Sequence, residues 1–245
     1  MSTVQGGQGN IVTNGLILNL DAANPRSYAP PFNGTTWTDL SGNGNNGTLT
    51  NGPTFSSANG GSIVFDGTND YVNLVPPNFN RNEITVCTVY NYSFSSQNYP
   101  LLLGNGTTTS DESFYISSLG PIYGTNRGKI SAFFKAGNTT NQSTGRIDLV
   151  SSIITTGSYF YLTITYQTSS FANMYINGVL NVSASTTSNL LNPQTGSFNI
   201  GGGNPPNVGC DFYTGSISLV QIYNRALNAS EVLQNFNATR ARFGV

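Results

Sequence analysis

Hydrophobic and polar positions alternate in short runs along most of the chain, the period-two pattern of half-buried β-strands. Every second residue from Ile84 to Phe94 is Ile, Val, Thr, Tyr or Phe, and Tyr159–Tyr166 alternates in the same way. Further runs that predict strands are Leu16–Asp21, Ile63–Asp66, Tyr71–Leu74, Leu101–Leu103, Phe114–Ser118, Lys129–Phe134, Ser197–Ile200 and Ile217–Tyr223. Short strands at this spacing predict an all-β sandwich.

One hairpin has a specific turn signal. The apolar runs Met174–Ile176 and Val179–Leu180 flank Asn177-Gly178. Both central positions of a type I′ turn need a positive φ, which Asn and Gly tolerate best. We therefore expect a tight hairpin over residues 171–183.

The two ends of the chain and one internal region depart from the strand pattern. Residues 1–13 are rich in Gly and Gln and predict a flexible N-terminal arm, which leaves residues 14–245 as one domain. Residues 22–55 contain prolines and a Gly/Asn run, so they predict loops. Near the C-terminus, Asn228 and Glu231 form a capping-box pattern, which predicts one short helix and a structural role for Glu231.

The composition narrows the choice of partners. Only 8% of the residues are charged and the net charge is -1, so a phosphate-binding surface for nucleic acid is not expected. No apolar stretch has the length of a membrane span. Aromatic residues make up 11% of the chain and supply a core, which argues against disorder.

The chain start and the two cysteines bear on where the protein works. Residues 1–10 have neither a basic nor an apolar region, so we expect no secretory signal. The uncharged Asn/Thr/Ser/Gly-rich surface is nevertheless typical of an exported or particle-borne protein. Cys87 and Cys210 can be two free thiols, with Cys87 packed as a small hydrophobe, or a disulfide.

Five segments carry short motifs in a fixed order over about residues 16–243. They are Trp37–Leu49, Ile63–Val72, Met174–Leu180, Phe198–Gly202 and Gly215–Phe236. Together they resemble the laminin-G-like, concanavalin A-like jelly-roll domains of phage and bacterial proteins. The resemblance implies two antiparallel sheets packed face to face, in a domain that binds carbohydrate or protein and often a structural calcium ion.

Two functions follow as hypotheses. The low-charge, Asn-rich sequence is most similar to virion proteins of tailed phages, including cyanophages, which predicts a protein made in the host cytoplasm and placed on the virion surface. There it would decorate or cement the capsid or tail, with other virion proteins as partners. The alternative is a lectin-like adhesin that recognises a host surface polysaccharide. The sequence leaves open whether the chain forms a homo-oligomer.

Catalysis is not expected. Glycosidases need two carboxylates at a defined separation, and the fold's hydrolases place them on one strand. The chain has three glutamates, Glu83, Glu112 and Glu231, and no two share a predicted strand. The absence of histidine excludes His-based triads and His metal ligands.

A turn rich in oxygen-bearing side chains is the candidate calcium site. Asp39, Ser41, Asn43 and Asn45 alternate around glycines, and calcium prefers six to eight oxygen ligands. Asp39 is the main candidate ligand, with Asn43, Asn45, and either Asp21 or Asp211 as partners.

The alternative for this turn is a set of Asx hydrogen bonds. The resemblance implies an acidic pair in the last strand, but those places hold Ser218 and Leu219. Asp66 and Asp70 flank another turn, and turn chemistry alone accounts for them.

Tyrosines are the candidate carbohydrate platforms, because sugar rings stack on exposed aromatic faces. Tyr92, Tyr99, Tyr123 and Tyr213 are the candidates. The alternative for each is a place in the core, which the alternation favours for several of them. Trp37 is expected to anchor its loop onto the sheet.

Overall fold

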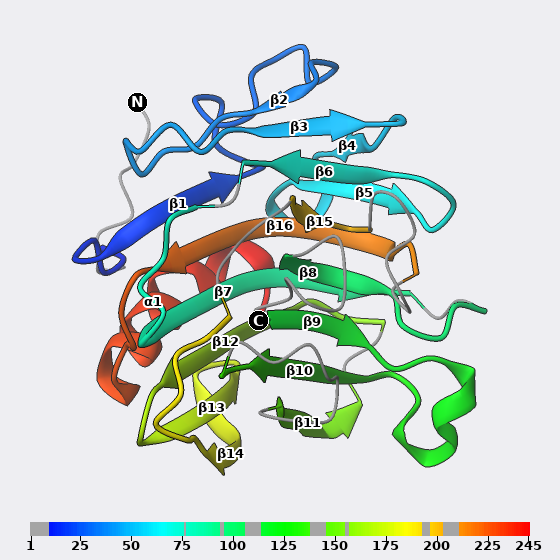
Figure 1. Cartoon of the computed structure of the whole chain (residues 1–245). Coiled ribbons are helices and arrows are strands. Elements are labelled where there is room, and N and C mark those ends of the chain that lie inside the picture. Colours follow the sequence, from blue (N-terminus) through cyan, green and yellow to red (C-terminus); the bar gives the residue numbers. More distant parts are fainter. Residues whose placement is uncertain are drawn as a thin grey trace.

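The computed structural model describes residues 10–75, 77–93, 96–105, 114–137, 146–154, 157–192, 197–202 and 211–245. Two antiparallel sheets of eight strands each face one another, and one helix lies at the C-terminal end of the chain (Figure 1). The predicted two-sheet jelly-roll sandwich is therefore confirmed.

The first sheet runs between two edge strands, β14 and β4. Its strands, in spatial order, are β14 (Val179–Ser185), β13 (Phe171–Ile176), β12 (Phe160–Gln167), β7 (Glu83–Tyr92), β16 (Thr214–Tyr223), β5 (Ser62–Asp66) and β4 (Thr54–Ser56). A further strand, β1 (Leu16–Asp21), pairs antiparallel with β16.

The second sheet runs from β11 to β2. Its strands, in spatial order, are β11 (Arg146–Ile154), β10 (Lys129–Lys135), β9 (Phe114–Ser118), β8 (Leu101–Asn105), β15 (Phe198–Ile200), β6 (Tyr71–Leu74), β3 (Gly47–Thr50) and β2 (Thr36–Trp37). Two 3₁₀ segments, η1 (Ala58–Gly60) and η2 (Pro121–Asn126), lie in connections.

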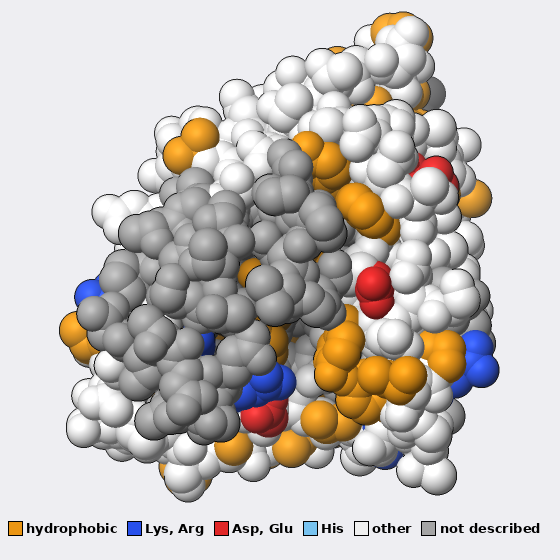
Figure 2. All heavy atoms as spheres, turned by 45° about the vertical axis from the view of Figure 1, so that its right-hand side comes forward, with side chains coloured by type: hydrophobic (Ala, Val, Ile, Leu, Met, Phe, Trp, Pro, Cys, Tyr) orange, Lys and Arg blue, Asp and Glu red, His pale blue; other side chains and the backbone are white. Residues whose placement is uncertain are grey.

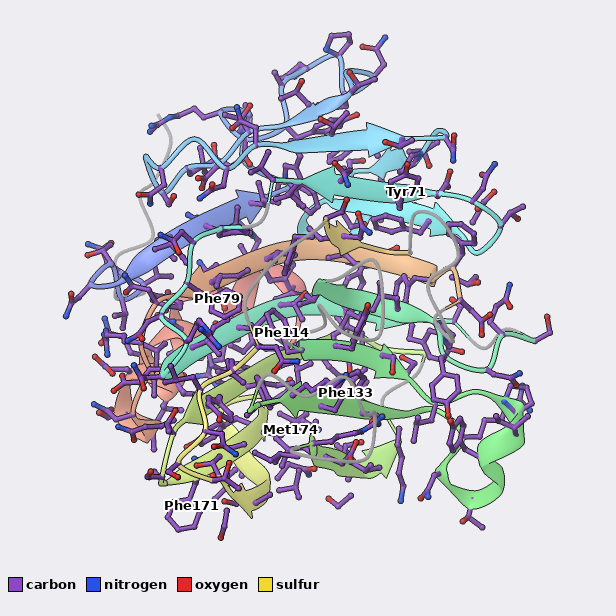
Figure 3. The ribbon with its side chains drawn as sticks, in the orientation of Figure 1. Tyr71, Phe79, Phe114, Phe133, Phe171 and Met174 are labelled. Carbon is purple, nitrogen blue, oxygen red and sulfur yellow. The ribbon has the colours of Figure 1, made fainter. Side chains whose placement is uncertain are left out.

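The main core fills the space between the sheets. Alternate residues of each strand point inward, and Phe134 on β10 lies 4.9 Å from Tyr166 on β12, centroid to centroid. The ring centroid of Phe114, labelled in Figure 3, lies 5.9 Å from the centroids of both Phe79 and Phe198. Trp37 is fully buried in this core, which confirms its predicted anchoring role.

A second core lies on the outer face of the first sheet, under the helix α1 (Ala229–Phe243). Val232 and Phe236 of α1 pack with Cys87 and Tyr161 from the sheet. Strand β7 is thus buried on both faces, against the second sheet on one side and α1 on the other. Cys87 is a buried thiol, as one prediction had it, and Cys210 lies outside the described residues.

The predicted helix start is confirmed in atomic detail. The side chain of Asn228 accepts from the backbone N–H of Glu231, and the Glu231 carboxylate accepts from the N–H of Asn228. Arg225 forms a bidentate pair with Glu231, which holds the pKa of that carboxyl below its usual value. The helix has 15 residues, longer than the short helix expected.

One further sequence-based expectation is confirmed and three need correction. The hairpin turn is confirmed, with positive φ at Asn177 and Gly178. The region 22–55 was predicted as loops but contains β2, β3 and β4, and β11 was missed. The predicted arm extends too far, because Val12 is buried and its N–H donates to Asn235 of α1. Residues 1–9 lie outside the described part.

Candidate functional site

The Asp39 turn lies between β2 and β3. Oδ1 of Asp39 accepts from the backbone N–H groups of Asn19 and Ser41, both at 2.9 Å. Oδ2 accepts from the Ser41 hydroxyl at 2.7 Å and from the N–H of Asn45 at 3.0 Å. A carboxylate has about four lone-pair sites. All four are used inside the protein, and the residue is buried.

The other predicted calcium ligands do not complete a metal shell. The side-chain amides of Asn43 and Asn45 donate to the carbonyls of Leu16 and Ile17, so they tie the turn to β1. Among the described residues, no group of three or more acidic, Cys or His side chains could hold a metal ion. The arrangement does not fit calcium and matches the Asx-bonded alternative.

Asp21 belongs to a different contact. Its two carboxylate oxygens accept from Arg242 of α1 at 2.8 and 2.9 Å. The ion pair ties the end of β1 to the last turn of the helix. The prediction that Asp21 joins Asp39 at one site is therefore wrong, because a bidentate arginine already occupies its carboxylate.

Two of the four predicted sugar platforms are wrong. Tyr92 and Tyr213 have no exposed surface and lie 5.7 Å apart, ring centroid to centroid, inside the main core. Burial raises the pKa of Tyr213 well above its ordinary value. Neither ring offers a face to a ligand.

The other two predicted tyrosines come together at the surface. Tyr99, in the loop before β8, is 36% exposed and meets Tyr123 of η2 edge to face, with centroids 5.0 Å apart. The carboxylate of Asp211 holds the Tyr99 loop by accepting from two backbone N–H groups. Figure 2 brings this side of the molecule forward and shows hydrophobic side chains gathered on it.

A second aromatic cluster, which the sequence reasoning missed, lines a groove of about 460 Å³. We call it the aromatic groove. It lies beside β2, β3 and β4, the strands at the top of Figure 1. The lining residues are Tyr28, Phe32, Asn33, Gly34, Thr35, Leu49, Asn51, Gly52, Pro53, Thr54 and Phe55.

Three rings in this groove pack together, and two of them are partly exposed. Phe32 and Phe55 are stacked with centroids 4.2 Å apart and planes 13° apart, and both are only partly buried. Tyr28 lies beneath them, 5.9 Å from Phe55, and is 2% exposed. Its hydroxyl donates to the carbonyl of Gly34 at 2.8 Å, which fixes the loop that carries Phe32.

The backbone at the groove has a positive φ at two positions. Phe32 and Asn51 have φ values of 61° and 66°. A positive φ is tolerable for Asn but is a genuine outlier for a bulky aromatic residue. Strain of this kind costs on the order of 1–3 kcal/mol and often occurs where a ligand is held. Here it places the Phe32 ring against Phe55.

The groove carries polar groups beside its rings. Asn33, Thr35 and Thr54 are exposed, and the side-chain amide of Asn51 donates to the carbonyl of Asn69. A sequence signal for the site was present. Phe32 and Phe55 each stand beside Pro, Asn and Gly, outside the alternating runs that would place an aromatic ring on a buried sheet face.

The described glutamates serve the fold. Glu83 accepts from the Gln167 side chain and the N–H of Ala226, and Glu231 pairs with Arg225. Glu112 lies outside the described residues. Burial raises the pKa of the Cys87 thiol to about 11, so it is protonated near neutral pH and is no nucleophile.

The aspartates at the other turn also have structural partners. The backbone N–H groups of Thr68 and Asn69 donate to Asp66, and the first of these lowers its pKa. Asp70 accepts from the N–H of Asp66, so turn chemistry accounts for both carboxylates. Among the described residues, no helix is long and apolar enough to cross a membrane.

Solved structures with the same fold include toxin binding domains. The binding domain of Paraclostridial Mosquitocidal Protein 1 is 18% identical with a TM-score of 0.67, and the match covers 92% of this chain and 52% of that one. The botulinum neurotoxin serotype D binding domain is 14% identical, with a TM-score of 0.68 and coverages of 92% and 52%.

A third match is the binding domain of botulinum neurotoxin DC in complex with SialylT, at 12% identity, a TM-score of 0.68 and coverages of 92% and 52%. The chain thus spans about half the length of these structures, and the low identities show a shared fold alone. The matches give no support to the predicted phage origin.

A comparison with curated proteins gave no significant match. Residues 66–233, more than half of the chain, match the family model described as the concanavalin A-like lectin/glucanases superfamily. The matched region begins at the end of β5 and extends into α1, so it includes most of both sheets. The chain belongs to the concanavalin A-like lectin/glucanases superfamily.

Proposed function

We propose that the chain is a non-catalytic carbohydrate-binding module and that its aromatic groove holds the sugar. The observation that carries the proposal is the stacked, partly buried pair Phe32–Phe55 in a groove with exposed Asn and Thr side chains. The groove volume of about 460 Å³ lies within the range of small-molecule sites.

The chemistry of a sugar matches these two kinds of surface. One face of a pyranose ring presents C–H groups, which pack on aromatic carbon and leave water. The ring hydroxyls both donate and accept, as do the amide of Asn33 and the hydroxyls of Thr35 and Thr54. A rigid aromatic pair also loses little conformational entropy on binding, because Tyr28 and the core already hold it in place.

The comparisons support this proposal at the level of the fold. The superfamily includes lectins, and a structure with the same fold is described as a complex with SialylT. Because this chain matches only about half of that structure, the likeness carries no information about where a sugar binds here. The argument for the groove rests on its own residues.

Lack of catalysis is part of the proposal. It is supported by the two described glutamates, Glu83 and Glu231, which are engaged with Gln167 and Arg225 and lie on different elements. A glycosidase needs a pair of carboxylates facing one bond.

The test is glycan binding with a matched pair of variants. We expect the wild-type protein to bind oligosaccharides on a glycan array, and Phe55→Ala to weaken that binding at least tenfold by calorimetry. Phe171→Ala is the control, because Phe171 is 54% exposed on β13, at the opposite end of the molecule in Figure 3. Equal loss in both variants, or no binding by the folded wild type, would contradict the proposal.

A place on a virion remains a prediction from the sequence. It is compatible with carbohydrate binding, since a particle-borne module can contact a host surface polysaccharide. Mass spectrometry and immunogold labelling of purified particles from the source would test it. Stoichiometric presence on a capsid or tail would support the virion role and the predicted virion partners, and absence would leave a free or cell-surface lectin.

A further inference from the structure

We infer that the aromatic groove selects neutral glycans and discriminates against glycans that carry sialic or uronic acid. The inference rests on the proposed function and names its ligand class. It differs from what a fold shared with a SialylT complex would suggest.

The first support is the lining of the groove. Among the described residues that form it, none is charged: they are three aromatic residues, Leu49, Pro53 and residues of Asn, Gly and Thr. A carboxylate that leaves water needs a cation or several strong donors, and without them the cost is large. Proteins recognise carboxylates mainly with the guanidinium of Arg or the ammonium of Lys.

The second support is a buried carboxylate behind one wall. A Cβ built on Gly52 would lie 4.0 Å from Oδ1 of Asp70, which is 5% exposed. The other oxygen, Oδ2, accepts from the N–H of Asp66 at 3.1 Å. Burial raises the pKa of Asp70 above its ordinary value. In its ionised form Asp70 places a negative charge next to the groove, where it is less screened than at the surface. An anionic ligand would be repelled, whereas a neutral one would not.

The surrounding surface agrees with this reading. In Figure 2 the uppermost of the described side chains are hydrophobic or uncharged, and an acidic side chain is visible below them at the upper right. Arg26 is exposed and precedes Tyr28 by two residues, but it is not part of the lining. The experiment must therefore control for an effect of Arg26 on ligand binding.

The Tyr99–Tyr123 pair has a different electrostatic setting. Lys129 donates to the side chain of Asn126, at 3.0 Å, so a cation contacts the same 3₁₀ segment, η2, that carries Tyr123. An acidic glycan that bound the protein would find a counter-ion there and none in the lining of the groove. We therefore expect a ligand bound at the Tyr99–Tyr123 pair to tolerate an acidic group and a ligand bound in the aromatic groove to lack one.

The experiment uses an array of neutral oligosaccharides, each paired with a counterpart that differs only by a sialic or uronic acid residue. Calorimetry on the best pair follows at 50 and 500 mM NaCl. We expect at least tenfold tighter binding of the neutral member and less than a twofold change with salt, because no charge is paired on binding. Asn33→Lys adds a cation at the exposed rim and should reduce the preference at low salt. Arg26→Gln should leave it unchanged.

Several results would overturn the inference. Equal or tighter binding of the acidic member, or loss of binding in Arg26→Gln, would show that charge recognition dominates. Neutral binding that survives in Phe32→Ala and Phe55→Ala but fails in Tyr99→Ala would move the ligand to the other aromatic pair and overturn the assignment to the groove, while leaving a binding module. Binding of no glycan by the folded wild type would instead refute the proposed function itself.

Discussion

The Asp39 turn and the aromatic groove come from the same stretch of chain, residues 28–55, and use their side chains in opposite ways. All four hydrogen-bonding positions of the Asp39 carboxylate are filled by donors of the protein itself. In the groove, Phe32 and Phe55 keep part of their rings exposed at a strained backbone. A side chain whose partners are all internal stabilises the fold, whereas exposed apolar surface beside strain is available to a ligand.

The largest effect should follow from Asp39→Ala. Three backbone N–H groups, those of Asn19, Ser41 and Asn45, would lose their acceptor in a partly buried place. We expect the free energy of unfolding to fall by about 3 kcal/mol or more, measured by urea denaturation. At temperatures where the variant stays folded, glycan affinity should change less than twofold. A stability loss below about 0.5 kcal/mol would show that the turn is not closed as described.

A smaller effect links the two regions. Tyr28→Phe keeps the ring but removes the hydroxyl that donates to Gly34. We expect a loss of about 1 kcal/mol in stability. Glycan affinity should fall severalfold, since the loop that carries Phe32 is less firmly held. Unchanged affinity would mean that the preformed position of Phe32 does not matter for binding.

The Asp21–Arg242 ion pair is a second contact whose partners both belong to the protein. The Arg242 side chain is 37% exposed and that of Asp21 12%. Arg242→Ala should cost about 1 kcal/mol, the value usual for a partly exposed ion pair, and less at high salt. Glycan binding should stay as in the wild type. A large loss of glycan affinity would place the ligand near α1 instead.

Calcium should not change the stability of the protein, because all hydrogen-bonding positions of the Asp39 carboxylate are already occupied by donors of the protein. We expect the melting temperature to shift by less than about 1 °C between 5 mM EDTA and 5 mM CaCl₂. Asp39→Asn under the same two conditions is the control. A calcium-dependent stabilisation that this variant abolishes would restore the metal hypothesis.

The affinity for a neutral glycan should depend least on pH. Tyr28 is the titratable side chain among the described groove residues, and burial raises its pKa above the ordinary value of 10. It therefore stays protonated below pH 9, and neutral-glycan affinity measured by calorimetry should be constant from pH 5 to pH 9. A tenfold change within that window would implicate a charged partner.

The strand framework was predictable because local and tertiary preferences agree. Alternation marked β7 and β12, and Asn177-Gly178 marked the hairpin by its need for positive φ. The capping box at Asn228 is equally local and was found. Strand β11 was missed because its hydrophobic pattern is short. Only Ile147 and Leu149 point into the core, and the residues that alternate with them at the start of the strand, Arg146 and Asp148, are charged.

The site was less predictable, because alternation gives the face of a residue but not what covers that face. Tyr92 ends a strand that is covered on both sides, and Tyr213 packs against it, so both are core residues. Phe32 and Phe55 lie outside every alternating run and meet only through the tertiary fold. The Asp39 pattern was found in the sequence. The sequence could not decide between a calcium site and an Asx-bonded turn, because these differ only in whether the Asp39 carboxylate binds a metal ion or backbone N–H groups.

The most direct test of the account is a two-dimensional NMR titration with the tightest-binding neutral glycan. We predict that backbone amide shifts change at residues 33–35, 51–52 and 54–55, which line the aromatic groove, and stay constant at residues 39–45 of the Asp39 turn. Shift changes centred on Tyr99 and Tyr123, with none in the groove, would contradict the account.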